Sequence, residues 1–173
     1  LTHGGIENNV KVNLIRIESD ELKIENTRKE LKNISGVLIP GGFGKRGIEG
    51  MIIAANYARR KNVPYFGICL GMQIAIIEFA RYEAKLNQAN STEFNKLTPH
   101  PVIALVTEWK DKSGKLEQRN PNSDLGGTMR LGGQKCKLKK SSLSYRLYKK
   151  DKINERHRHR YEVNPNYKDK LIE

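Results

Sequence analysis

A cysteine enclosed by two glycines is the residue of this sequence best suited to chemistry. Cys69 lies in the string GICLG, between Gly67 and Gly71. This is the cysteine form of the nucleophile elbow, a sharp turn from a strand into a helix that presents a nucleophilic side chain. Glycine on either side relieves the steric clash of such a turn, and the dipole of the following helix stabilises a thiolate. We predict that Cys69 is a nucleophile; the alternative is a small buried core residue, the usual fate of a free cysteine.

A second glycine-rich loop is expected beside the elbow. Residues 36–39 form a short apolar run that stops at PGGFG, and residues 64–68 form another that stops at the elbow. In an open parallel sheet, loops at the carboxyl ends of strands share one edge, and ligands bind there. The amide of Leu70 and the Gly41–Gly42 backbone are therefore candidate donors to an oxyanion formed at Cys69.

The remaining pattern alternates strands and helices. Such alternation predicts an α/β fold with a mostly parallel central sheet and helices on both faces. We expect an exposed, lid-like loop over residues 110–127, which are polar and rich in glycine, asparagine and proline. The expected strands are 10–17, 36–39, 64–68, 101–109, 128–138 and 155–163, and the expected helices are 25–32, 48–60, 70–86 and one that starts at 167.

Length and composition bound the class of protein. The chain has 173 residues, 37% hydrophobic and 29% charged, which predicts one globular domain. No apolar run approaches the ~20 residues that span a bilayer. The other cysteine, Cys136, lies among lysines in an expected strand and is interpreted as a packing residue. Two cysteines without metal-site spacing predict neither a metal centre nor a disulfide framework, and they fit a reducing, cytoplasmic setting.

Five strings together resemble one known family. Residues 67–73 (GICLGMQ) are similar to the nucleophile motif of class I glutamine amidotransferases. The other four strings narrow the resemblance to the glutaminase domain of the CTP synthase family. They are residues 40–50 (PGGFGKRGIEG), 89–94 (ANSTEF), 126–132 (GGTMRLG) and 156–163 (RHRHRYEV). The relatives in GMP synthase, carbamoyl-phosphate and anthranilate enzymes share only the elbow.

The resemblance implies a three-layer fold, a reaction and a set of site residues. In this family a cysteine thiolate attacks the carboxamide of L-glutamine, forms a glutamyl thioester and releases ammonia. The resemblance implies Cys69 as the nucleophile, Gly41 and Leu70 as oxyanion-hole amides, Arg119 as a residue of the GTP-effector loop, and Gly42, Leu70, Gly71, Met72, Gln73, Glu93 and Arg160 as glutamine-binding residues.

The chemistry of the two charged residues agrees with this. An amino-acid substrate has one cationic and one anionic group, and a planar guanidinium can hold a carboxylate through two parallel bonds. Taken without the family, Glu93 could equally cap a helix, and residues 156–160 could be a strand with arginines on one face and histidines on the other. His157 and His159 are not predicted as the general base, because the family base lies elsewhere.

The sequence also departs from the family pattern. The family base is a histidine followed two residues later by a glutamate, beyond the point where this sequence ends, and the first strand of the glutaminase domain is not seen. Residues 1–173 are therefore expected to be a partial domain with little or no turnover alone. The resemblance implies an amidoligase domain, which binds ATP, Mg²⁺ and UTP, as the covalently attached partner, a homotetramer as the assembly, and GTP as the activator. No metal and no cofactor are expected within residues 1–173.

Two other functions stay open at this point. One is a different class I amidotransferase or a hydrolase with the same elbow. The other is a basic nucleic-acid-binding module, since 32 lysines and arginines against 19 acidic residues give a net charge of +13. The basic runs lack the interleaved aromatic residues on which bases stack, so neither a nucleic acid nor a membrane is expected as a partner.

Overall fold

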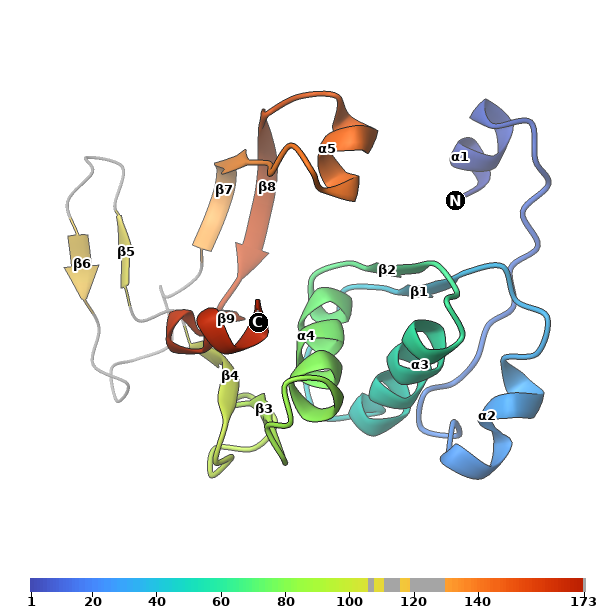
Figure 1. Cartoon of the computed structure of the whole chain (residues 1–173), viewed down its shortest axis with the longest axis horizontal. Helices are drawn as coiled ribbons and strands as arrows, with labels where there is room; N and C mark the ends of the chain where they lie inside the picture. The colour runs from blue at the N-terminus through green and yellow to red at the C-terminus, as the bar shows by residue number, and fades with distance from the viewer. Residues whose placement is uncertain (106–107, 111–115, 119–129, 173) are drawn as a thin grey trace.

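The computed structural model describes residues 1–105, 108–110, 116–118 and 130–172 (Figure 1). The helices are α1 (Thr2–Glu7), α2 (Ile24–Glu30), α3 (Ile48–Arg60), α4 (Leu70–Tyr82), α5 (Leu143–Tyr148) and the 3₁₀ turns η1 (Pro165–Tyr167) and η2 (Asp169–Leu171). The strands are β1 (Val37–Ile39), β2 (Tyr65–Gly67), β3 (Asn90–Ser91), β4 (Pro101–Leu105), β5 (Glu108–Lys110), β6 (Leu116–Gln118), β7 (Arg130–Lys137), β8 (Lys152–His159) and β9 (Tyr161–Val163).

A parallel strand pair with two helices forms the body of the fold. β1 and β2 pair in parallel, from Val37 opposite Tyr65 to Ile39 opposite Gly67. Helices α3 and α4 lie on the same side of this pair and pack against each other (Figure 1). Between them Ile52 of α3 and Ile74 of α4 are almost fully buried. The contact brings the start of α4 to the carboxyl ends of both strands.

A buried carboxylate fixes how α3 and α4 meet. Glu78 of α4 is 2% exposed. It accepts hydrogen bonds from the guanidinium of Arg59 and from the amide of Asn56, both on α3. A carboxylate at this depth is tolerated because it is paired and hydrogen-bonded. The two helices are therefore held at one mutual register.

A second sheet lies at the other side of α4. β3 pairs in parallel with β4, and β4 pairs antiparallel with β9. Val102 and Ile103 of β4 are fully buried and belong to the same core as Ile74. β9 thereby comes close to α4 in space, although the two elements lie far apart in the sequence.

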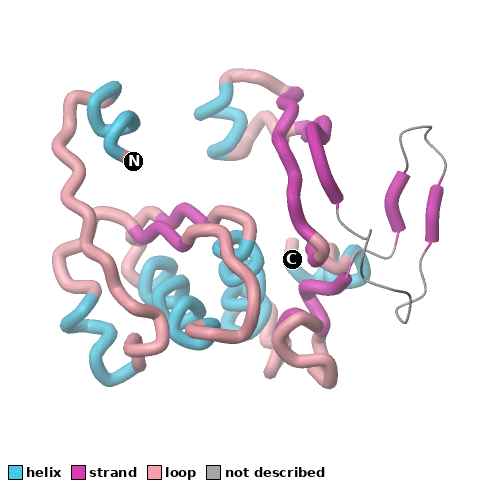
Figure 2. The backbone as a smooth tube through the Cα atoms, turned by 180° about the vertical axis from the view of Figure 1, so that it is seen from behind, coloured by secondary structure: helices cyan, strands magenta, loops and turns pink. Residues whose placement is uncertain are grey.

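An eight-residue antiparallel ribbon projects from this body. β7 and β8 pair from Arg130 opposite His159 to Lys137 opposite Lys152, and Figure 2 shows the ribbon extending away from α3 and α4. Exposed and half-buried residues alternate along both strands. The exposed face carries five cations and no carboxylate. They are Lys135, Lys137, Lys152, Arg156 and Arg158. The half-buried face carries Cys136, His157 and His159.

Most expected elements of the central region are confirmed. Helix α3 matches the expected residues 48–60, and β1, β2 and β7 lie within expected strands. The α/β class is confirmed, with parallel pairing at β1–β2 and β3–β4 and antiparallel pairing in the other described pairs. None of the described helices combines the length and apolar character needed to cross a bilayer.

The strand expected at residues 10–17 is wrong. This segment has no regular structure, and Val10, Leu14 and Ile15 are exposed. Among the described residues no strand pairs with it, and an apolar alternation without a ladder partner does not make a strand.

Four other boundaries differ from expectation. Helix α4 ends at Tyr82 rather than residue 86, because Lys85 adopts a left-handed backbone with φ 56°. Of the loop expected at residues 110–127, the described part includes strand β6, which pairs with β5, and residues 111–115 and 119–127 lie outside the described residues. The strand expected at 155–163 is divided into β8 and β9 at Arg160. The helix expected from 167 onward is replaced by 3₁₀ turns.

Candidate active site

Cys69 occupies a strained backbone position at the head of α4. Its φ is 54° and its ψ is −102°, a conformation that costs a non-glycine residue about 1–3 kcal/mol. The amide of Ile68 donates to the carbonyl of Ile39 at 3.0 Å, and the amide of Gln73 donates to the carbonyl of Cys69 at 3.2 Å. These bonds fix the turn on both sides, and the thiol-bearing residue is exposed. The expected elbow is present.

Close backbone contact explains the two glycines of the elbow. A Cβ on Gly67 would lie 2.4 Å from the carbonyl carbon of Gly71, and a Cβ on Gly71 would lie 2.1 Å from the carbonyl oxygen of Ile39. The hydroxyl of Tyr65 donates to the carbonyl of Gly71 at 2.6 Å. Burial, with a smaller contribution from Glu78, raises the pKa of Tyr65 well above its ordinary value, so this donor keeps its proton. The elbow is therefore built by backbone packing that side chains would prevent.

The two candidate oxyanion donors lie beside the thiol. A Cβ on Gly41 would lie 3.5 Å from the Cβ of Cys69. Leu70 is the first residue of α4, where the N–H groups of a helix have no intrahelical acceptor. Within the described part of the chain, neither the Gly41 amide nor the Leu70 amide donates to another protein group. Both amides are thus free to stabilise a negative charge developing next to Cys69.

The residues after Cys69 divide between the core and the surface. The side chain of Leu70 is 4% exposed, whereas Met72 is 43% exposed. Gly71 is buried, and a Cβ on Gly42 would lie 3.1 Å from Cδ2 of Leu70. The two glycine-rich loops are therefore in contact, as predicted from their positions after β1 and β2.

Glu93 reaches the glycine-rich loop from a distant part of the chain. Its Oε1 accepts the amide of Gly44 at 3.0 Å, and its side chain is partly buried. Gly44 has a φ of +85°, which favours glycine over other residues. The structure thus brings the predicted acidic residue to the loop that carries Gly41 and Gly42.

Arg160 is exposed at the junction between β8 and β9. The pKa of the next residue, Tyr161, depends on both charged candidates, Glu93 and Arg160. Burial raises the pKa of Tyr161, the carboxylate of Glu93 raises it further, and the guanidinium of Arg160 opposes both. The two charged candidates thus act on the pKa of the same phenol with opposite sign.

Gln73 has a contact that the sequence did not predict. Its side chain is 5% exposed, and its amide nitrogen donates to the carbonyl of Tyr161 at 3.1 Å. The resemblance named Gln73 as a glutamine-binding residue, but it gave no sign of this bond to Tyr161. Arg119, the candidate for the effector loop, lies outside the described residues.

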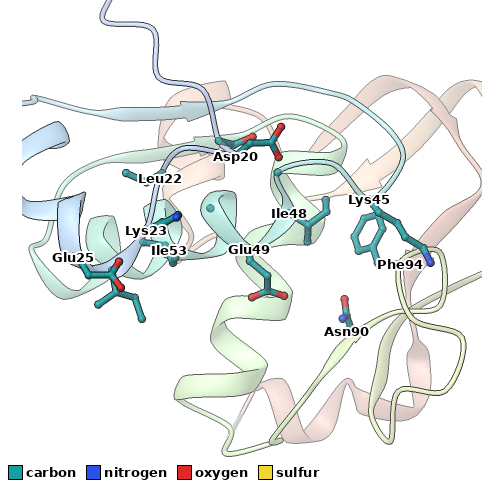
Figure 3. A pocket seen from close by; sticks show the side chains of 14 residues that line it. Asp20, Leu22, Lys23, Glu25, Lys45, Ile48, Glu49, Ile53, Asn90 and Phe94 are labelled. Carbon is teal, nitrogen blue, oxygen red and sulfur yellow. The ribbon is translucent and has the colours of Figure 1, made fainter.

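A hollow of about 580 Å³ lies next to this site without including Cys69 (Figure 3). Its wall combines apolar residues with carboxylates and lysines. Two of its carboxylates already have partners, since Asp20 pairs with Arg46 and Glu49 pairs with Arg81. The third, Glu25, lies on a wall whose described residues include no cysteine, so the elbow with its exposed thiol is the stronger candidate site.

Comparison with known proteins agrees with this geometry. The family described as Glutamine amidotransferase class-I matches residues 1–173. The chain belongs to the class I glutamine amidotransferases. A solved structure with the same fold is the glutaminase domain of Trypanosoma brucei CTPS with bound acivicin, at 38% identity and a TM-score of 0.83. The alignment covers 98% of this chain and 62% of that one, so the chain spans less than two thirds of its amidotransferase relative.

The family assignment confirms the predicted resemblance and the fold class. The class I amidotransferase fold places its nucleophile elbow where a strand passes into a helix, and the described chain has such a turn between β2 and α4. Among the described residues there is no group of three histidine, cysteine, aspartate or glutamate side chains that could hold a metal ion.

Proposed function

We propose that residues 1–173 form part of the glutaminase domain of a CTP synthase and that Cys69 is its nucleophile. The observation that carries this proposal is the elbow. An exposed thiol lies at the head of α4 in a strained turn, with the Gly41 and Leu70 amides beside it. A chain 38% identical in sequence is a CTPS glutaminase domain.

The reaction follows from the positions of these groups. The Cys69 thiolate adds to the carboxamide carbon of L-glutamine, and the resulting oxyanion accepts hydrogen bonds from Gly41 and Leu70. The carbon–nitrogen bond then breaks, ammonia leaves, and a glutamyl thioester remains. Water cleaves the thioester to glutamate and restores the thiol. The resemblance assigns the proton transfers to the histidine of the family pattern.

The substrate is held by its two charged groups. In this proposal Glu93 binds the α-ammonium of glutamine and Arg160 binds the α-carboxylate, while Gly42, Leu70, Gly71, Met72 and Gln73 line the side-chain pocket. Glu93 keeps one oxygen on the Gly44 amide, which fixes the carboxylate relative to the oxyanion loop. The T. brucei domain has acivicin, a glutamine analogue, bound to it, which supports glutamine as the substrate.

The remaining proposals concern the whole enzyme. Ammonia released at Cys69 passes to an amidoligase domain, where UTP activated by ATP and Mg²⁺ is aminated to CTP. GTP activates the enzyme through the loop that contains Arg119, and the full-length enzyme is a homotetramer. These statements rest on the resemblance to CTP synthase.

The experiment compares two nitrogen donors in the full-length protein that contains these residues. We expect Cys69→Ala to abolish CTP formation from glutamine, by about 10⁴-fold or more, and to keep CTP formation from ammonia. Cys136→Ala is the matched control, because it removes the other thiol: it should use ammonia normally and lose far less than about 10⁴-fold with glutamine. If Cys69→Ala still uses glutamine, the nucleophile is assigned wrongly. If the wild type makes no CTP from either donor, the proposal that the protein is a CTP synthase is rejected.

A further inference from the structure

The half-buried face of the β7–β8 ribbon holds a chain of hydrogen-bonding groups that ends at Tyr161. Cys136 Sγ lies 3.9 Å from His157 Nε2, and His157 Nδ1 lies 2.9 Å from His159 Nε2. His159 Nδ1 lies 3.0 Å from the carbonyl oxygen of Tyr161. The chain thus leads from Cys136, near the far end of β7, to the residue after Arg160.

Only one placement of protons satisfies every link when both rings are neutral. The last acceptor is a carbonyl, so His159 must carry its proton on Nδ1. His159 Nε2 then accepts, which requires a proton on Nδ1 of His157. His157 Nε2 is left as an acceptor that faces the thiol of Cys136 at 3.9 Å, while that thiol donates to the carbonyl of Gln134 at 3.6 Å. His159 therefore uses both nitrogens within the protein and keeps no lone pair for the role of a general base.

The charges around His159 favour its neutral form. Burial lowers the pKa of His159, and the nearby His157 and Arg130 lower it further. Glu162 and the carbonyl of Tyr161 act in the opposite direction and only partly compensate. Neutral His159 is the state that donates from Nδ1 while it accepts at Nε2.

A second donor reaches the same carbonyl from the nucleophile helix. Gln73 Nε2 donates to the carbonyl of Tyr161 at 3.1 Å, so this oxygen is held by α4 and by β8 together. Arg160 lies between His159, which donates, and Tyr161, which accepts. The side chain of His159 therefore closes a small loop around the backbone of Arg160.

We infer that His159 is a positioning residue for Arg160, oriented by His157 and assisted by Gln73; this inference rests on the proposed function. Arginine loses considerable rotamer freedom when it binds a ligand, and a fixed backbone reduces how much must be ordered at that moment. Loss of the His159 donor should therefore weaken glutamine binding. It should leave the reactivity of the Cys69 thiol unchanged, because the elbow is built by β1, β2 and α4.

The test measures how L-glutamine protects Cys69 from alkylation by iodoacetamide, resolved peptide by peptide in the full-length protein. His159→Asn keeps an N–H at the place of Nδ1, whereas His159→Phe keeps the ring and removes the donor. We expect His159→Phe to raise the half-protecting glutamine concentration about tenfold, the equivalent of one net hydrogen bond. His159→Asn should stay within about twofold of the wild type. His3→Phe, at an exposed histidine on α1, is the matched control.

The outcomes separate this inference from the proposed function. Protection of His159→Phe at wild-type concentrations overturns the positioning role alone, and so does an equal defect in His159→Asn. A wild type that glutamine does not protect rejects the proposed function and this inference together. If His159→Phe does not fold, ¹⁵N NMR of the wild type decides: a proton on Nδ1 of His159 is expected, and a proton on Nε2 alone overturns the inference.

Discussion

The elbow and the ribbon position their candidate residues in opposite ways. At the elbow, glycine lets backbone touch backbone, and Cys69 is placed by the absence of side chains at positions 67 and 71. In the ribbon, side chains two residues apart along β8 bond to each other and to the carbonyl of Tyr161, and so hold the backbone around Arg160. The first kind of site is sensitive to added atoms, and the second is sensitive to lost donors.

The largest expected difference between the two regions is in how much stability each loses when a glycine is replaced by alanine. Gly71→Ala would bring a Cβ to 2.1 Å from the carbonyl of Ile39, a backbone atom that cannot move without breaking the elbow. In Gly133→Ala the Cβ meets only the side chain of Asn154 at 3.0 Å, which can turn away. We expect Gly71→Ala to lower the free energy of unfolding by about 3 kcal/mol and Gly133→Ala by less than about 1, measured by urea unfolding. Equal losses would mean that the elbow is not tightly packed.

The two cysteines offer a second contrast between the regions. Cys69 is exposed, whereas Cys136 is half-buried with its sulfur 3.6 Å from the carbonyl of Gln134 and 3.9 Å from His157. In the native protein without ligand, iodoacetamide should modify Cys69 about tenfold faster than Cys136. Mass spectrometry of the two peptides measures both rates in one sample. In urea the rates should converge, and similar rates in the native state would contradict the described difference in exposure.

The smallest expected effect is a dependence of stability on pH that comes from the ribbon. Because the folded state lowers the pKa of His159, the unfolded chain binds its proton more readily. The contribution of this residue to stability is therefore complete above the ordinary histidine pKa of about 6.5 and is lost as the pH falls toward the lower folded pKa. His159→Asn should remove this component. We expect the difference in Tm between pH 8 and pH 5.5 to shrink by no more than about 2 °C, and an increase would contradict the sign.

The sequence predicted the elbow better than the ribbon for a physical reason. Strained turns and close backbone contacts require glycine at fixed spacing. The elbow can therefore be recognised in the sequence from Gly67, Cys69 and Gly71. The link between Gln73 and Tyr161 joins residues 88 positions apart and depends on the packing of β9 beside α4. No local pattern encodes such a distance. The same limit explains the strand expected at residues 10–17, where alternation was present and a ladder partner was not.

In the candidate site, too, some contacts could be predicted from the local sequence and others only from the fold. The nearness of Gly41 to Cys69 could be predicted, because loops after adjacent parallel strands meet at one edge. The bond from the Gly44 amide to Glu93 could not, although the resemblance named Glu93. Likewise the alternation of histidines and arginines in β8 was visible, but the register of β7 and β8 was needed to place Cys136 on the histidine side.

The bond between Glu93 and Gly44 has a consequence for how this sequence can diverge. One carboxylate oxygen holds the glycine-rich loop, and in the described residues the other oxygen takes no protein donor. Aspartate is one methylene shorter and would lose contact with the loop, while glutamine could keep the loop bond but would carry no charge for a ligand. Aspartate therefore removes the observed bond to the loop, and glutamine removes the charge that the proposed ligand contact needs. A lineage that drifts at this position must first remodel the loop, so we expect the residue and the loop to change together in evolution or not at all.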